Sequence, residues 1–199
     1  MNPQQLDEIV ALHDLNRHPF YRAWRAGELS RSTIAVYAAE YAPFIDSIEL
    51  GWSALGDIHH AAEERQHAVL WGRFRDALGS AGEPRCEEAA SLARCAIDAF
   101  VDPSQALGAL YAFEAQQPAT AQSKLEGLME HYGFTDHQAA YFRIHASDYG
   151  ERDRLAVRAD RLSPDDSARA RDACERTCRA MWRALDGILR DGTAAPTGS

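Results

Sequence analysis

Carboxylate and imidazole side chains recur at helical spacing between residues 60 and 67. Glu63 and Glu64 stand four and three residues before His67, so one of the two shares a helical face with this histidine. His60, seven residues before His67, lies on the same face. Such a face can bind a metal ion, but the spacing alone favours pairing between solvated side chains at the surface.

Glu114 is the second candidate. It follows Leu107, Leu110 and Tyr111 on an apolar helical stretch and stands four residues before Pro118. A buried carboxylate at this place needs a partner, because a polar group without one destabilises the fold. Two partners remain open: the backbone groups that Pro118 frees, or a metal ion.

His145 is the third candidate, and it follows Tyr141 and Phe142 on a stretch with apolar neighbours. The default for such a residue is a core histidine whose hydrogen bonds are satisfied. Asp148, three residues later, would share its face on a continuous helix. Together the three stretches contain the carboxylate and imidazole ligands typical of iron or manganese sites in helical bundles.

The elements that position these residues are expected to be helices throughout. Ala, Leu, Glu and Arg dominate, runs of β-branched residues are missing, and apolar residues recur every three or four positions. Caps, prolines and glycines divide this pattern. The expected helices cover residues 3–15, 20–27, 30–56, 57–79, 85–100, 104–132, 135–162 and 164–191. Pro118 should kink one of them just after Glu114.

Length and composition predict one all-α domain. The 199 residues, of which 46% are apolar, can bury a single sizeable core. We expect this domain to cover residues 1–191, with a loop over the stretch SAGEP at 80–84. The remaining residues, 192–199, are expected to form a disordered tail.

The net charge of −9 repels nucleic-acid backbones and anionic membrane surfaces, so neither is an expected partner. The first residues lack a basic stretch followed by an apolar one, and no segment approaches about 18 apolar residues. A cytoplasmic protein is therefore expected. Its cysteines have no metal-binding or redox spacing and are expected to be structural thiols; they are Cys86, Cys95, Cys174 and Cys178.

Three stretches of the sequence resemble the CADD branch of the TenA/PqqC superfamily of haem-oxygenase-like proteins. They are HPFYRAWRAGELSRSTIAVYAAEYAPF, HAVLWGRFRDALG, and ALGALYAFEAQQPATAQSKLEGLMEHYGFTD followed by YFRIHASD. The third is the most specific, because a Glu, a Pro, a Lys and a Gly-Leu keep the order and spacing of that branch. The resemblance covers most of the chain. It implies a seven-helix bundle, usually dimeric, with a di-metal site that activates oxygen.

The resemblance also implies roles for single residues. The best-known members of the branch resemble suppliers of 4-aminobenzoate for folate synthesis, with their own tyrosine as the source of the ring. Tyr21 matches this sacrificial tyrosine, and Lys124 matches an active-site lysine. Glu114 falls on a metal-ligand Glu, His67 on a ligand His, and His145 on the first ligand of a pattern H-x-x-x-D-x-x-H.

The match then departs from the family. The Asp of that pattern is Tyr149 here and its second His is Arg152, so two usual ligands are missing unless Asp148 or Glu151 takes over. A guanidinium cannot coordinate a metal, which predicts at most one tightly bound ion. Arg152 is expected to pair instead with Glu114 or Asp148.

The family's first Glu usually lies seven residues before the ligand His. An ungapped match places His60 there, whereas a three-residue deletion places Glu63 there. The stretch between Tyr41 and His67 is shorter than in the family, which agrees with a deletion.

The leading hypothesis is an oxygen-activating oxidase or oxygenase that uses iron or manganese, as one or two ions, and acts on a small molecule or on its own side chains. Its partners would be dioxygen and a small-molecule substrate. The proposed ligands are Glu63 or Glu64, with His67, Glu114 and His145, and Asp148 as a substitute.

Three other functions are alternatives to this hypothesis. A TenA-like enzyme would need a cysteine on the helix that carries Phe113 and Glu114, and none is present. A cofactor-free oxidase like PqqC would bind an anionic substrate through basic residues such as Arg152, His67 and Lys124. A non-catalytic binding protein with a degenerate metal site is the third alternative.

Overall fold

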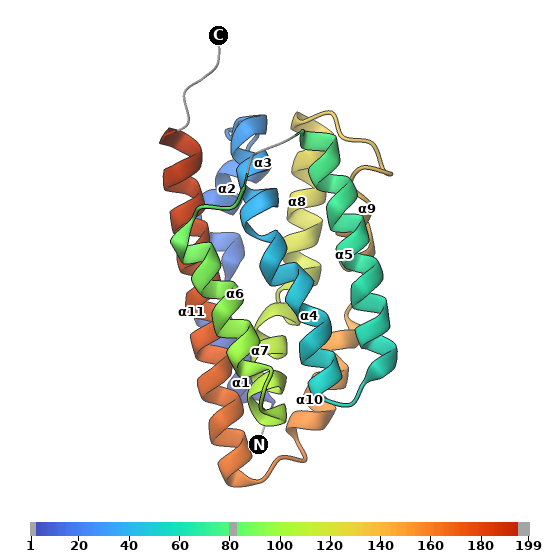
Figure 1. Ribbon diagram of the computed structural model, residues 1–199, viewed down its shortest axis with the longest axis vertical. Helices are drawn as coiled ribbons and strands as arrows, with labels where there is room; N and C mark the ends of the chain where they lie inside the picture. Colours follow the sequence, from blue (N-terminus) through green and yellow to red (C-terminus); the bar gives the residue numbers. More distant parts are fainter. Residues whose placement is uncertain (1–2, 80–82, 195–199) are drawn as a thin grey trace.

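The computed structural model of the protein describes residues 3–79 and 83–194, and within these ranges the regular structure is helical, with no β-strand (Figure 1). The elements are α1 (Gln4–Leu12), η1 (Leu15–Arg17), α2 (Pro19–Arg25), α3 (Arg31–Glu40), α4 (Ala42–Ala54), α5 (Ile58–Leu78), α6 (Glu87–Ala99), α7 (Pro103–Glu114), α8 (Gln117–His131), α9 (Ala140–His145), α10 (Gly150–Ala159) and α11 (Pro164–Ala194). The predicted all-α class is therefore confirmed.

α11 is the longest helix and runs along one side of the bundle, where it packs against α6 and α7 (Figure 1). Its buried face carries small and apolar residues, among them Ala170, Cys174 and Cys178. Gly108 of α7 is required for this packing, because a Cβ there would lie 1.9 Å from the carbonyl oxygen of Ala170. The four cysteines of the chain are unpaired.

α4 lies between this layer and α5, and it packs against α5, α6 and α7 (Figure 1). α5 also contacts α3 and α9, while α10 packs against α7. The core at the centre is rich in aromatic rings, including Trp24, Tyr37, Trp71 and Phe142, which contact one another edge to face or tilted. These rings hold the helices that carry the candidate site at fixed positions.

The kink predicted after Glu114 is confirmed. α7 ends at this residue, and α8 begins at Gln117 with Pro118 in its first turn. The continuous helix expected over residues 30–56 was wrong, because it is broken at Tyr41, with Pro43 in the first turn of α4. These breaks, with the one described next, divide the chain into more segments than the seven helices that the resemblance implied.

The single helix expected over residues 135–162 was also wrong. α9 covers only Ala140–His145, and α10 begins at Gly150. Between them the Asp148 carboxylate accepts a hydrogen bond from the Gly150 amide, a local bond that competes with a helical backbone. His145 and Asp148 therefore do not stand on one helical face.

α11 continues to Ala194, three residues beyond the expected end of the domain. The rest of the expected tail, 195–199, and residues 80–82 of the expected loop lie outside the described residues. In the described parts of the chain, no helix combines the length and the apolar character needed to cross a bilayer.

Candidate functional site

Three side chains from two helices meet in the interior of the bundle. α5 presents Glu64 and His67 on its inner face, and His67 Nδ1 lies 3.0 Å from Glu64 Oε1. α10 contributes Glu151, and one ligand atom from each of the three residues lies within 4.8 Å of the others. The pair on α5 has the Glu-x-x-His spacing found in carboxylate metal sites of helical bundles.

Glu114 joins this group from the end of α7. It is buried, and its Oε1 accepts a hydrogen bond from the indole nitrogen of Trp52 at 3.4 Å. Its Oε2 has no hydrogen-bond partner within the described part of the chain. At the break before Pro118, the side-chain amide of Gln116 donates a hydrogen bond to the backbone carbonyl of Ala112. The hydrogen bond from Trp52 thus occupies Oε1 alone and leaves the other carboxylate oxygen of Glu114 able to bind a ligand.

His145 of α9 completes the donor set. Its side chain is buried, and neither ring nitrogen has a hydrogen-bond partner among the described residues. Its ring lies 4.6 Å from that of His67, centroid to centroid. Burial, together with His67 and Lys124, lowers the pKa of His145 to about 3, so this imidazole is neutral and keeps a lone pair at neutral pH.

Two carboxyl groups of this interior group, those of Glu114 and Glu151, bind protons more tightly than exposed carboxyl groups do. Burial raises the pKa of Glu114 well above its usual range, and the charges of Glu151 and Glu64 raise it further. Burial and Glu64 raise the pKa of Glu151 to about 8. Burial by itself lowers the pKa of His67, but the hydrogen bond to Glu64 and the nearby acids outweigh it and raise that pKa.

The residues of the interior cluster fit a divalent metal ion. They are Glu64, His67 and Glu151, whose ligand atoms lie together, with Glu114 beside Glu151 and His145 beside His67. The orphaned polar atoms of Glu114 and His145 are buried where a cation would satisfy them, and the mutual repulsion of the carboxylates favours a cation over protons. Carboxylate and imidazole donors suit first-row metals such as iron and manganese.

Other predicted residues lie elsewhere. Glu63 is on the outer side of α5, with its side chain 47% exposed, so Glu64 is the glutamate that faces His67. Asp148 binds the Gly150 amide, and Tyr149 is 65% exposed. The partners of Glu63 and Asp148 thus lie outside the interior cluster, and Tyr149 faces solvent.

Arg152 was expected to pair with Glu114 or Asp148, and this expectation was wrong. Its guanidinium binds Asp7 of α1 and Asp153, because the break before α10 turns the residue toward α1. The adjacent Glu151 points inward instead. The cation that was expected to weaken a second metal position therefore lies on another face of the helix.

A second group of polar side chains is buried between α2, α3 and α8. Lys124 Nζ lies 3.3 Å from the hydroxyl of Tyr21 and 3.4 Å from that of Tyr37, and it stands 4.6 Å from the centre of the Tyr21 ring. The two hydroxyls are 3.0 Å apart. Burial lowers the pKa of Lys124 to about 7, whereas burial and Tyr37 raise the pKa of Tyr21 well above its usual value.

These residues close a cavity of about 10 Å³. Tyr41, whose hydroxyl has no partner in the described chain, and Tyr141 also line it. A space of this size holds about one water molecule. Tyr141 connects the two groups, because its ring also lies 4.5 Å from that of His145 and its hydroxyl accepts a hydrogen bond from Gln117.

Several residues of the two groups were not predicted from the sequence. Glu151 was considered only as a substitute ligand, although its place one residue from a position of the family pattern pointed to it. Tyr37 and Tyr141 were not singled out as site residues, because a tyrosine on an apolar helix is usually a core residue. Trp52 had no distinguishing feature in the sequence.

Comparison with known proteins gives a consistent result. A family model described as "Iron-containing redox enzyme", of the haem-oxygenase type, matches residues 48–182. A 4-aminobenzoate synthase of Chlamydia muridarum is 30% identical, with 95% of this chain and 90% of that protein covered. A 4-aminobenzoate synthase of Nitrosomonas europaea is 26% identical, with 93% and 89% covered.

Solved structures share the fold. A protein with a haem-oxygenase-like fold from Shewanella denitrificans superposes with a TM-score of 0.81 at 16% identity, covering 97% of this chain and 94% of that one. A CADD-like protein from Nostoc punctiforme gives a TM-score of 0.71 at 18% identity, with 95% and 96% covered. A TenA homologue from Pseudomonas syringae gives 0.74 at 15% identity, with 94% and 92% covered.

Proposed function

The chain belongs to the haem-oxygenase-like family of iron-containing redox enzymes, and from this we propose that it makes 4-aminobenzoate by oxidising its own Tyr21. One observation carries the choice of substrate. The cavity at Tyr21 has room for about one water, so a free aromatic substrate does not fit, whereas the phenol of Tyr21 is already inside. The names of the relatives support the product.

In this proposal the interior cluster holds iron or manganese. Glu64, His67, Glu114, His145 and Glu151 supply three carboxylates and two imidazoles, which suffice for one ion with a position left for dioxygen. When bound, the metal activates dioxygen and accepts electrons from the substrate. Glu151 and His67 release protons as the ion binds, because a metal ligand must be deprotonated.

Lys124 and Tyr37 position the phenol of Tyr21. In 4-aminobenzoate the nitrogen stands para to the carboxyl carbon, where tyrosine has its hydroxyl, so a nitrogen must replace this oxygen, which leaves as water. The amine of Lys124 lies 3.3 Å from that oxygen. Since burial lowers the pKa of Lys124 to about 7, a large fraction of this amine has a free lone pair at neutral pH.

The surrounding aromatic residues exclude bulk water from this chemistry. Tyr21, Tyr37 and Tyr141 are buried, and Tyr141 separates the cavity from His145. Its hydroxyl is held by the amide of Gln117 at 2.8 Å, which fixes the orientation of the ring. A dry site of this kind strengthens electrostatic interactions and suppresses side reactions.

The test is complementation of a bacterial strain that requires 4-aminobenzoate. We expect growth with the unaltered gene and with Tyr149→Phe, a control at an exposed tyrosine, but not with Tyr21→Phe or Lys124→Ala. Mass spectrometry of the protein recovered from complemented cells should show modification at Tyr21. Equal growth with all four genes would overturn the proposal.

The cofactor-free alternative finds no support in the positions of its residues. Arg152 pairs with Asp7 and not with the cavity that Lys124 lines. An anionic substrate would therefore meet neither a preformed space nor the arginine that was to bind it.

A further inference from the structure

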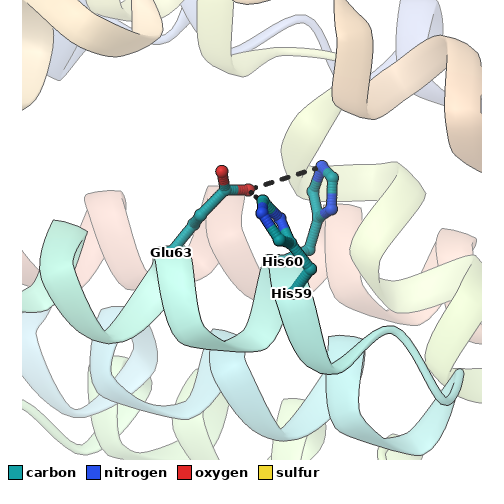
Figure 2. A group of neighbouring side chains, drawn as sticks. All are labelled: His59, His60 and Glu63. Atoms are coloured by element: carbon teal, nitrogen blue, oxygen red, sulfur yellow. Dashed lines mark ion pairs between the residues drawn. The ribbon is translucent and has the colours of Figure 1, made fainter.

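A second group of metal-binding side chains stands at the start of α5. Figure 2 shows His59, His60 and Glu63 projecting from one side of this helix, with the Glu63 carboxylate directed at both rings. His59 Nδ1 lies 3.4 Å from Glu63 Oε2, and His60 Nε2 lies 3.7 Å from the same oxygen. One ligand atom from each residue lies within 4.8 Å of the others.

The helix itself produces this arrangement. Glu63 follows His59 by four residues and His60 by three, and side chains at these spacings are neighbours on a helix surface. Neither neighbour requires a strained backbone. Small rotations of the exposed His59 and Glu63 side chains, 79% and 47% accessible, would bring three donors to coordination distance of one ion.

His60 is prepared for coordination by Asp57. The Nδ1 of His60 lies 3.3 Å from Asp57 Oδ1, but the two atoms are not aligned well enough for a hydrogen bond. No other group in the described chain pairs with this nitrogen. This contact favours the proton on Nδ1 and leaves the lone pair on Nε2, which faces Glu63. Histidines that bind metals commonly turn their other nitrogen toward a carboxylate in this way.

Asp57 is itself held in place. Its other carboxylate oxygen binds Arg158 at 3.1 Å and lies 3.7 Å from Arg154, and its Oδ1 caps the backbone amide of His60. The side chain of Asp57 is 11% exposed. The residue that orients His60 is thus a rigid part of the protein and not a mobile surface acid.

This group is separate from the interior cluster. Glu63 and Glu64 are adjacent, and successive residues of a helix point about 100° apart. Glu64 accordingly faces inward with 3% of its side chain exposed, and Glu63 faces outward. The two groups share no residue, so an ion can bind at one without the other.

We propose that His59, His60 and Glu63 form a second metal site, which binds one divalent first-row ion of the zinc type at the surface of α5. Two imidazoles and one carboxylate leave a fourth position for water, as in zinc sites with three protein ligands. Because His59 and Glu63 are accessible, the ion exchanges with solvent faster than one in the interior cluster. This site does not depend on the reaction proposed above.

The experiment first removes two donors of the interior cluster. In a Glu64→Gln/His67→Gln protein, titration with Zn²⁺ followed by calorimetry should show one bound ion per chain. Adding His59→Ala and Glu63→Ala should weaken this binding at least about tenfold, whereas adding His137→Ala, a control at an exposed histidine of the loop before α9, should not change it. Asp57→Asn keeps an oxygen for the helix cap and should weaken binding about tenfold.

A measurement on the unaltered protein guards against misfolding of the variants. Zn²⁺ should shift the imidazole NMR resonances of His59 and His60 but not that of His137. Absence of these shifts, or equal affinity with and without His59 and Glu63, would overturn the proposal.

Discussion

The ring of Tyr141 lies 4.5 Å from that of His145 and also forms a wall of the cavity at Tyr21 and Lys124. One aromatic side chain therefore separates the metal donors from the phenol. Tyr141 thus contacts both groups of residues, which lie far apart in the sequence.

The metal content should depend on the interior cluster and not on Tyr149 and Arg152, which occupy the second and third positions of the family pattern. We expect about one tightly bound iron or manganese ion per chain, because the five donors of the cluster suffice for one ion and not for two. Glu151→Ala and His145→Ala should each lower affinity at least about tenfold. Asp148→Ala, a change outside the cluster, is the control. Elemental analysis after dialysis measures both effects, and an equal loss in Asp148→Ala would contradict the assignment.

Glu151→Gln should stabilise the metal-free protein increasingly as the pH rises. The pKa of Glu151 is raised to about 8 in the folded chain, so the contribution of this group to stability is present below its unfolded pKa and is lost as the pH rises through its folded pKa. We expect the advantage of the variant to grow from about pH 5 to about pH 8, to about 4 kcal/mol. Urea unfolding in a chelator measures it. A constant difference would contradict the raised pKa.

Lys124→Met should have the opposite pH dependence. The pKa of Lys124 is lowered to about 7 by burial, so the unfolded chain binds a proton that the folded chain releases between that pH and its unfolded pKa. The variant should be more stable by about 4 kcal/mol below about pH 7, and the difference should shrink toward about pH 10. Thermal unfolding across this range is the measurement. A difference that widens with pH would show that the amine is charged in the folded protein.

Gly108→Ala should destabilise the protein by about 3 kcal/mol, because its new methyl group would overlap the Ala170 carbonyl where α7 meets α11. Gly72→Ala is the matched control: a Cβ at Gly72 of α5 meets no atom within 4 Å, so this change should stabilise by about 1 kcal/mol. Urea unfolding of both variants gives the comparison. Equal effects would mean that helix propensity, and not the close approach, decides at Gly108.

Local chemistry explains which parts of the fold could be predicted. Pro118 removes a backbone donor, so the break after Glu114 followed from the sequence. Between α9 and α10, the hydrogen bond from the Gly150 amide to Asp148 competes with a continuous helix. No sequence pattern shows which of the two conformations is more stable.

The same break explains the errors at the site. Residues of α10 keep helical spacing among themselves but not to His145, so the family spacing led to Arg152 while the inward residue is Glu151. Which of Glu63 and Glu64 faces the interior depends on which side of α5 other helices cover. The sequence does not show this side, because the residues around the two glutamates are polar on both sides of the helix. The types of ligand residue were predictable, because carboxylates and imidazoles are the side chains that iron and manganese bind.

The small cavity at Tyr21 also bears on inhibition. A compound shaped like the product has no preformed space to compete for, since the volume of about 10 Å³ is smaller than an aromatic ring. In the proposed function, an effective inhibitor is therefore one that removes the metal or prevents it from binding. Analogues of 4-aminobenzoate should not inhibit that reaction.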